Sequence, residues 1–441
     1  MHTNKNKYTH GHTALLAISL VMPLSAMALD TTGHSFELKA RGIYFDRDFE
    51  TDSNDRTQSA LGLQLNYESP YFADMIGVGI SGYSVNKLDN SGRNTSDVLS
   101  VDNNGELHDS FGQVAQAFVK LKYQDLASAK VGRQLHKSML LSSSGSRAVP
   151  NTFSGGSLQL MPLKGLSLYG ARYNEWSSRS DSSFEEFKTD NSADGAIDYI
   201  DSLGASYVAG PFSINLEHLR AQDFLKKTGL VASYNFTLGN QSSLKLTGGI
   251  HTSSDDGKLF VTGSESAELD DEDLPGAING VTDSDNDGQG IYLAANWKLG
   301  NVELGAAVTK FDGAWIEDNF AGDHGTNPFP TGGVLADFSN DNEQVWMLSA
   351  GYDWQDHVKG LKTVVSYKDG SDAKNSANAA LGEADENELA FDLTYQVPVI
   401  KGLAVRYIYL DYHSAKTGRL DGVKEDETDH RFYVDYTYRF F

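Results

Sequence analysis

Residues 388–397 read ELAFDLTYQV, a stretch in which apolar and polar side chains alternate. Successive side chains of a strand point to opposite faces, so the stretch predicts a strand with one apolar and one polar face. The apolar positions are Leu389, Phe391, Leu393, Tyr395 and Val397, and the positions between them are Glu388, Ala390, Asp392, Thr394 and Gln396.

Similar segments recur along the chain, from one centred near Arg41 to one centred near Tyr436. There are about 18 of them, each of roughly 9–13 residues, and a tilted transmembrane strand needs about 9–11. Short turns such as Gly210-Pro211 separate them in alternation with long polar loops, although the loop near Asp223 is short where a long one is due. The long loops lie near residues 86–109, 135–154, 178–195, 252–288, 312–342, 368–386 and 413–429.

Even-stranded outer-membrane barrels combine short periplasmic turns with long extracellular loops in this way. The pattern therefore predicts an all-β fold, a transmembrane antiparallel β-barrel of about 18 strands. A soluble β-sandwich or β-helix also alternates, but here the polar face is rich in Gly, Ser, Thr, Asn and charged residues, as a water-filled interior requires.

Composition narrows the class of protein further. The 441 residues include no Cys, which excludes disulfides and thiolate metal sites. The formal net charge of -24 argues against binding to nucleic acid, because phosphate backbones need a basic surface. No run outside the N-terminus approaches the roughly 18 apolar residues of a transmembrane helix.

The N-terminus predicts export. Lys5 and Lys7 precede an apolar run, ALLAISLVMPL, at residues 14–24, and SAMA at 25–28 offers a small-residue cleavage site. The run is too short to cross about 30 Å of hydrocarbon. We therefore expect residues 1–28 to be a signal peptide and residues 29–441 to form one barrel in the outer membrane.

Several motifs carry a resemblance to a known family. Residues 130–155 read KVGRQLHKSMLLSSSGSRAVPNTFSG, followed by a strand, a tight turn LKGL and a strand returning with GARY. FDRDF at residues 45–49 and ESPYFAD at 68–74 add to the pattern. Together these motifs resemble the OprD-type substrate-specific outer-membrane porins of Gram-negative bacteria, with residues 130–176 as the sharpest match.

This resemblance implies an 18-stranded barrel whose third extracellular loop, residues 134–153, folds into the lumen and narrows the pore. It also implies a column of basic side chains on the lumen wall that guides anionic groups. Members of the family take amino acids, small carboxylates or chitin oligosaccharides, so the resemblance does not choose the solute.

Strand parity predicts which cations face the lumen. Leu38 and Ala40 belong to an apolar face, so Lys39 and Arg41 point inward. The first and last strands of a closed barrel are neighbours, so most of these cations share one wall, which we call the basic ladder. The residues predicted to line the solute path are Lys39, Arg41, Lys120, Lys122, Arg147, Lys362, Lys368, Arg406, Arg431 and Arg439.

An alternative reading gives these cations no selective role. Lys or Arg facing lipid at the bilayer midplane costs about 2–4 kcal/mol, so charges in any barrel point inward. Glu388, Asp392 and Asp435 also interrupt the ladder, and Arg147 could equally tie the loop to the wall.

The loop at residues 252–288 is acidic, with eleven Asp or Glu and one Lys between Ser253 and Gly288. Asp283, Asp285 and Asp287 stand at alternate positions before a Gly, an arrangement that suits Ca²⁺. Ala294 stands where an EF-hand needs Glu, which leaves a calcium loop of another kind or a solvated acidic loop.

The sequence thus predicts a porin for passive, selective diffusion of small anionic or zwitterionic solutes, with no enzyme activity and no cofactor beyond that possible calcium. The alternatives are an oligosaccharide porin, a loop-mediated adhesin or a barrel enzyme. Expected partners are outer-membrane lipid and lipopolysaccharide, the solute, and the barrel-assembly machinery through the C-terminal strand, with no nucleic acid; both a homotrimer and a monomer stay open. An oligosaccharide track would use the inward aromatic residues Tyr83, Phe118, Tyr292 and Phe311.

Overall fold

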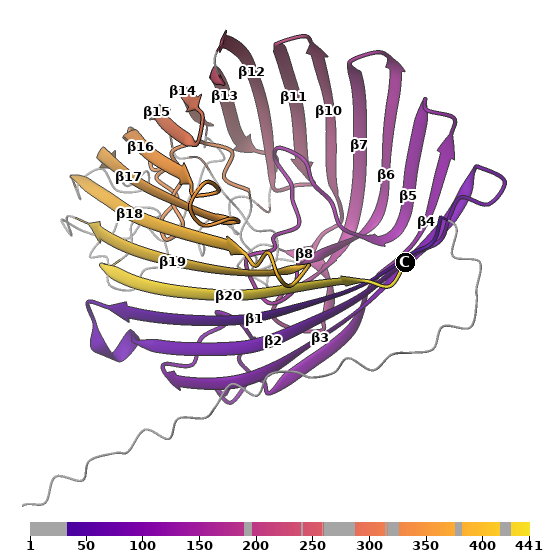
Figure 1. Ribbon diagram of the computed structural model, residues 1–441, viewed down its shortest axis with the longest axis horizontal. Helices are drawn as coiled ribbons and strands as arrows, with labels where there is room; N and C mark the ends of the chain where they lie inside the picture. Colours follow the sequence, from indigo (N-terminus) through magenta and orange to yellow (C-terminus); the bar gives the residue numbers. More distant parts are fainter. Residues whose placement is uncertain are drawn as a thin grey trace, which may run out of the picture. The chain divides into compact units, whose positions relative to one another are not determined.

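In a computed structural model of the protein, the chain winds into a closed antiparallel β-barrel (Figure 1). The predicted signal peptide, residues 1–28, lies outside the residues that the structure describes. Those residues are 33–188, 196–239, 241–257, 259, 287–313, 315, 326–374, 382–414 and 425–441.

Eighteen strands make the wall within these ranges, which confirms the predicted fold and strand number. Each of the alternating segments found in the sequence is one wall strand. The strands are β1 Ser35–Phe49, β2 Arg56–Glu68, β3 Ile76–Gly92, β4 Ser110–Tyr123, β5 Ala127–Gln134, β6 Thr152–Leu163, β7 Leu166–Ser177, β10 Ile200–Ala209, β11 Phe212–Ala221, β12 Leu225–Gly239, β13 Ser242–Asp255, β14 Asp287–Leu299, β15 Val302–Asp312, β16 Gln344–Asp353, β17 Leu361–Lys374, β18 Glu383–Gln396, β19 Leu403–Ser414 and β20 Glu427–Arg439.

The barrel closes between its first and last strands. Each wall strand pairs antiparallel with the next, and β20 returns to pair with β1 in a register that runs from Glu37 opposite Arg439 to Phe49 opposite Glu427. Figure 1 shows the yellow β20 beside the indigo β1. At the periplasmic end of this seam Phe36 and Phe440 stack at 4.7 Å between ring centroids, and the Phe440 amide donates to the Phe36 carbonyl.

Three small elements lie off the wall. A 3-10 turn, η1 (Asp52–Asn54), joins β1 to β2, and the short strand β8 (Phe184–Lys188) pairs with the last residues of β7 and with the short strand β9 (Ala196–Ile197). The wall itself continues from β7 to β10. Within the described residues, no helix is long and apolar enough to cross a membrane.

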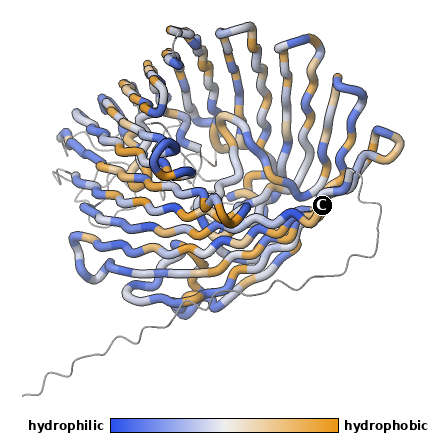
Figure 2. The backbone as a smooth tube through the Cα atoms, viewed as in Figure 1, coloured by the Kyte–Doolittle hydropathy of each residue, from blue (hydrophilic) through white to orange (hydrophobic). Residues whose placement is uncertain are grey.

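The two faces of the wall differ in exposure, and Figure 2 shows hydrophilic and hydrophobic residues alternating along the strands. On β14 the Leu293 side chain is 66% exposed on the outer face, whereas its neighbour Tyr292 is 6% exposed on the inner face. Outward-facing apolar groups of this kind indicate that lipid surrounds the barrel, because exposing a continuous apolar band to water is unfavourable. The buried apolar cluster lies on the inner face instead, where loop residues such as Leu140 and Val149 pack.

Several strands run further than the sequence predicts. The loops expected at 86–109 and 368–386 begin or end inside strands, because β3 continues to Gly92, β17 continues to Lys374 and β18 begins at Glu383. Backbone pairing persists beyond the membrane, where both faces of a strand meet water. Apolar alternation therefore stops marking a strand before its hydrogen bonds end.

Candidate functional site

Residues 135–151, the β5–β6 segment, are bound to two separate parts of the inner wall. Near its start, the hydroxyl of Ser138 and the amides of Met139 and Leu140 donate to Glu217 of β11, at 2.7, 2.8 and 3.3 Å. Further along, Arg41 of β1 donates to the carbonyls of Gly145 and Arg147. Since β11 and β1 lie far apart around the ring, the segment extends across the lumen between them.

Glu217 is completely buried and was not among the predicted site residues. Its carboxylate also accepts from the Tyr169 hydroxyl at 3.1 Å and the Ser202 hydroxyl at 2.8 Å. A buried carboxylate is tolerated when its lone pairs are all used, and these donors use them. Strand parity alone puts Glu217 on the inner face, but its partners depend on the path of the segment.

The predicted ladder residues of β17, β19, β20 and β1 lie on one continuous part of the wall. Their charges, however, are largely matched by acids that alternate with them. The pairs are Lys39–Glu37 at 3.1 Å, Arg41–Asp435 at 2.6 Å, Lys362–Asp353 at 3.3 Å, Lys368–Glu388 at 2.7 Å, Arg406–Asp392, Arg431–Asp429 at 2.7 Å and Arg439–Glu37 at 3.0 Å, with Lys120–Glu68 at 2.8 Å and Lys122–Asp74 at 2.6 Å further round the ring.

Arg147 differs from the other predicted residues, because it has no ion pair within the described part of the chain. Its guanidinium lies over the Phe45 ring, 5.1 Å from the centroid. Burial, together with the neighbouring cations Arg179 and Arg431, lowers the pKa of Arg147 to about 9. Arg147 is still charged at neutral pH, and an anion beside it would relieve this repulsion.

A second basic group, which the sequence analysis missed, lies at the extracellular ends of β1 and β2. Arg47 and Arg56 both donate to Asp97 of the β3–β4 loop, and Arg47 also binds Glu427 of β20 at 2.6 Å. Burial raises the pKa of Asp97, but the two guanidinium groups outweigh it and hold that pKa at about 2. The only signal in the sequence was the FDRDF motif, which contains Arg47.

A second chain segment is attached to the wall in the same way as the first. Residues 326–343, which belong to the β15–β16 segment, present the amides of Val334 and Leu335 to Glu388 of β18, each at 2.7–3.0 Å. Glu388 also pairs with Lys368. Lys368, predicted to line the solute path, is therefore 6% exposed and part of this attachment.

The inward aromatic residues do not form an open track. Tyr83, Phe118, Tyr292 and Phe311 are all buried. Phe118 covers the backbone at Gly79, and Phe311 packs edge-on against Phe329 at 4.7 Å between centroids. A passing sugar needs an accessible ring face, so these four rings cannot provide the stacking surface of an oligosaccharide pore.

The predicted calcium site is only partly described. Asp287 begins β14 at the barrel rim, whereas Asp283 and Asp285 lie outside the described residues. No group of three or more His, Cys, Asp or Glu with metal-binding geometry occurs among the residues described. Calcium binding by this loop stays a prediction from the sequence.

Comparison with known proteins gives consistent matches across the barrel. Residues 31–440 match the profile described as outer membrane porin, OprD family. Porin D of Pseudomonas aeruginosa is 25% identical over 426 residues, which cover 91% of this chain and 90% of porin D. The porin-like protein GalP of Pseudomonas putida is 25% identical over 242 residues, covering 51% of this chain and 57% of GalP.

Solved structures share the fold. OpdK of Pseudomonas aeruginosa, solved with vanillate, superposes with a TM-score of 0.78 at 21% identity, covering 93% of this chain and 99% of OpdK. OccAB3 of Acinetobacter baumannii superposes with a TM-score of 0.77 at 20% identity, covering 93% of this chain and 100% of OccAB3.

Proposed function

Since the chain belongs to the OprD family of outer-membrane porins, we propose that it passes small anionic or zwitterionic solutes, such as amino acids and carboxylates, by passive diffusion. The β5–β6 segment narrows the lumen and carries Arg147 beside the ladder. Outer-membrane lipid and lipopolysaccharide surround the apolar face, and the barrel-assembly machinery binds the C-terminal strand β20.

The observation that carries this proposal is the charge of Arg147. Most ladder cations already have carboxylate partners, so each offers a passing anion only part of its field. Arg147 lies near the cations Arg179 and Arg431. The nearby carboxylate of Asp97 is already bound by Arg47 and Arg56, so a solute carboxylate would complete the group. Fixed cations in a narrow, low-dielectric passage raise the local concentration of anions, as the field of a cleft does.

The paired ladder suits conduction rather than tight binding. A channel must hold its solute weakly enough to release it, so a row of partly neutralised cations is better than one free cation of high affinity. That OpdK is solved with vanillate, a carboxylate, supports the anionic class. The burial of Tyr83 and Tyr292 removes the support for the oligosaccharide alternative.

The test is Arg147→Gln in the full-length porin, reconstituted into planar bilayers. Under a KCl gradient we expect the anion-to-cation permeability ratio to fall by at least about threefold, since one fixed charge leaves the passage. Block by glutamate or benzoate should weaken in parallel. Lys401→Gln, in the exposed turn between β18 and β19, removes the same charge outside the lumen and should change neither quantity.

Two outcomes would contradict the proposal. If the wild-type barrel conducts no ions, it is not an open porin. If Arg147→Gln keeps the reversal potential and the carboxylate block of the wild type, this charge does not select anions. Arg41 is a poorer probe than Arg147, because its loss also releases the carbonyls of Gly145 and Arg147.

A further inference from the structure

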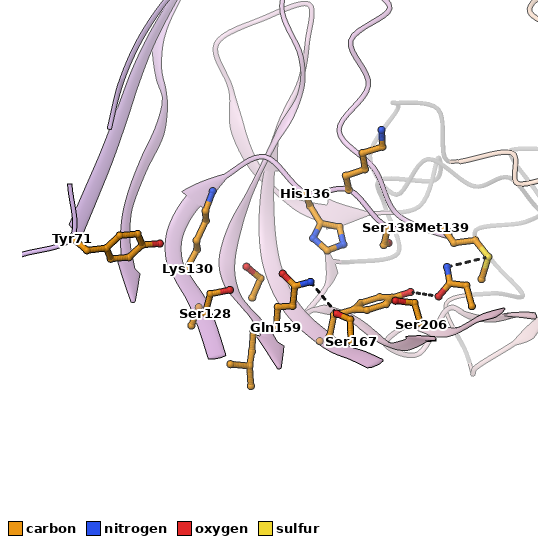
Figure 3. Close-up of a pocket in the computed structure, with 16 residues that line it drawn as sticks. Tyr71, Ser128, Lys130, His136, Ser138, Met139, Gln159, Ser167 and Ser206 are labelled. Carbon is orange, nitrogen blue, oxygen red and sulfur yellow. Dashed lines mark hydrogen bonds between the residues drawn. The ribbon is translucent and has the colours of Figure 1, made fainter. Parts of the chain in front are cut away.

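A cavity of about 620 Å³ lies beneath the β5–β6 segment, on the half of the ring opposite the ladder. Strands β5, β6, β7, β10 and β11 form its floor, and residues 136–139 of the segment form its roof. Figure 3 shows Gln159, Ser167 and Ser206 along the floor, below His136 and Ser138. The volume is within the roughly 300–1,000 Å³ of small-molecule sites.

The lining of this cavity is cationic and rich in hydroxyl groups. Two of its side chains, Lys130 and Lys137, have no ion pair in the part of the chain that the structure describes, and Asp and Glu are absent from its lining. Glu217 is close by, but its oxygens are occupied by the β5–β6 segment, Tyr169 and Ser202. Lys130 and Lys137 therefore border a space whose lining contains no carboxylate of the protein.

Lys130 illustrates the contrast with the rest of the inner wall. It stands directly opposite Lys120 in the β4–β5 register, and Lys120 is paired with Glu68 at 2.8 Å. The ammonium of Lys130 lies instead over the Phe118 ring, 4.5 Å from its centroid. A ring face compensates a cation only modestly, so Lys130 can still bind a carboxylate.

Neutral hydrogen-bonding groups make up most of the remaining lining, together with the apolar residues Ala129, Met139 and Leu158. The hydroxyls of Ser128 and Ser206 have no partner among the described residues, whereas Gln159 donates to Ser167 at 2.9 Å. An alkyl chain entering here would displace water from these groups without replacing its hydrogen bonds, whereas the hydroxyl groups of a polyol would replace them. The lining thus favours carboxylates that carry hydroxyl groups over carboxylates that carry an alkyl chain.

We infer that this cavity is a second solute subsite, below the β5–β6 segment, that takes carboxylates bearing several hydroxyl groups, the chemical class of the sugar acids. Lys130 and Lys137 hold the carboxylate, and the serine and amide groups hold the hydroxyls. The inference rests on the proposed anion-conducting function and narrows its solute. Because Tyr71, in the turn between β2 and β3, also lines the cavity, the subsite reaches the periplasmic end of the passage.

The test compares three probes of similar size in planar bilayers: gluconate, hexanoate and glucose. We expect gluconate to occupy the wild-type channel about tenfold longer per event than hexanoate, a difference of one decade in affinity, and glucose to give no resolved block. The double variant Lys130→Gln/Lys137→Gln should shorten gluconate events about tenfold. Ser206→Ala should shorten gluconate events and leave hexanoate events unchanged.

Lys164→Gln is the matched control, because Lys164 lies in the exposed turn between β6 and β7, outside the cavity. It should behave as the wild type, and an unchanged KCl conductance shows that each variant is folded. Equal residence of gluconate and hexanoate, or unaltered gluconate block in the double variant, overturns the subsite while carboxylate conduction stands. If no carboxylate blocks the wild type, the proposed function fails instead.

Discussion

At Asp97, one carboxyl group lies between the guanidinium groups of Arg47 and Arg56. Its pKa of about 2 lies below the roughly 3.9 of an unfolded Asp. A depressed pKa stabilises the folded state above the unfolded pKa, and the contribution disappears as the pH falls through the folded pKa. The pairing should therefore be complete above pH ~4 and lost towards pH ~2.

Asp97→Asn tests this window. At pH 7 the substitution should lower the free energy of unfolding by about 2 kcal/mol, and at pH ~2 the variant and the wild type should converge. Thermal unfolding in detergent across this pH range provides the measurement. Asp109→Asn is the control, because that carboxylate pairs with Lys87 while almost fully exposed, so its loss should be near zero. A difference for Asp97→Asn that persists at pH ~2 would refute the pairing.

At the scale of elements, Glu217 attaches the β5–β6 segment to the wall, and Glu388 attaches the β15–β16 segment in the same way. Each is a wall carboxylate that accepts two successive backbone amides, from Met139 and Leu140 in one case and from Val334 and Leu335 in the other. An unpaired buried amide costs about 1–3 kcal/mol, so these contacts decide whether a segment stays attached to the inner wall or leaves it.

We expect Glu217→Ala to release the start of the β5–β6 segment. The single-channel conductance should rise and fluctuate, because the segment no longer keeps one position. Glu303→Ala, on the exposed part of β15 near its turn, should leave the conductance steady. A steady, unchanged conductance in Glu217→Ala would mean that the segment's other contacts, such as those of Arg41 and Arg179, keep it in place.

These attachments are also the part of the structure that the sequence did not predict. Alternation predicted the eighteen wall strands, and parity put Lys39, Arg41 and Arg406 on one side, because both follow from local geometry. Parity cannot supply a partner: Lys368 and Lys362 look alike in sequence, yet one is buried against Glu388 and the other is largely exposed. Partners depend on segments from distant strands, and those contacts arise only in the closed ring.

For the whole molecule, lipid is the solvent of the outer face. Substitutions at neighbouring positions on one strand can test which face each position occupies. Leu293→Arg puts a charge in lipid and should cost about 2–4 kcal/mol in the free energy of unfolding from lipid. Ala294→Arg, one residue later, points into the lumen and should cost far less. Comparable losses for the two variants would contradict the assignment of faces.

Each segment is attached to the wall through one carboxylate, so the sequence of the wall and the sequence of the segment are under different constraints. The apolar alternation along the eighteen strands is required by the lipid around the barrel, so it tolerates little change. The β5–β6 segment does not face the lipid, so we expect that it can vary in length and polarity as long as two successive amides still reach Glu217. We therefore expect solute selectivity to change through the seventeen residues of this segment and through the wall residues that line the passage, while the outer face of the barrel stays apolar.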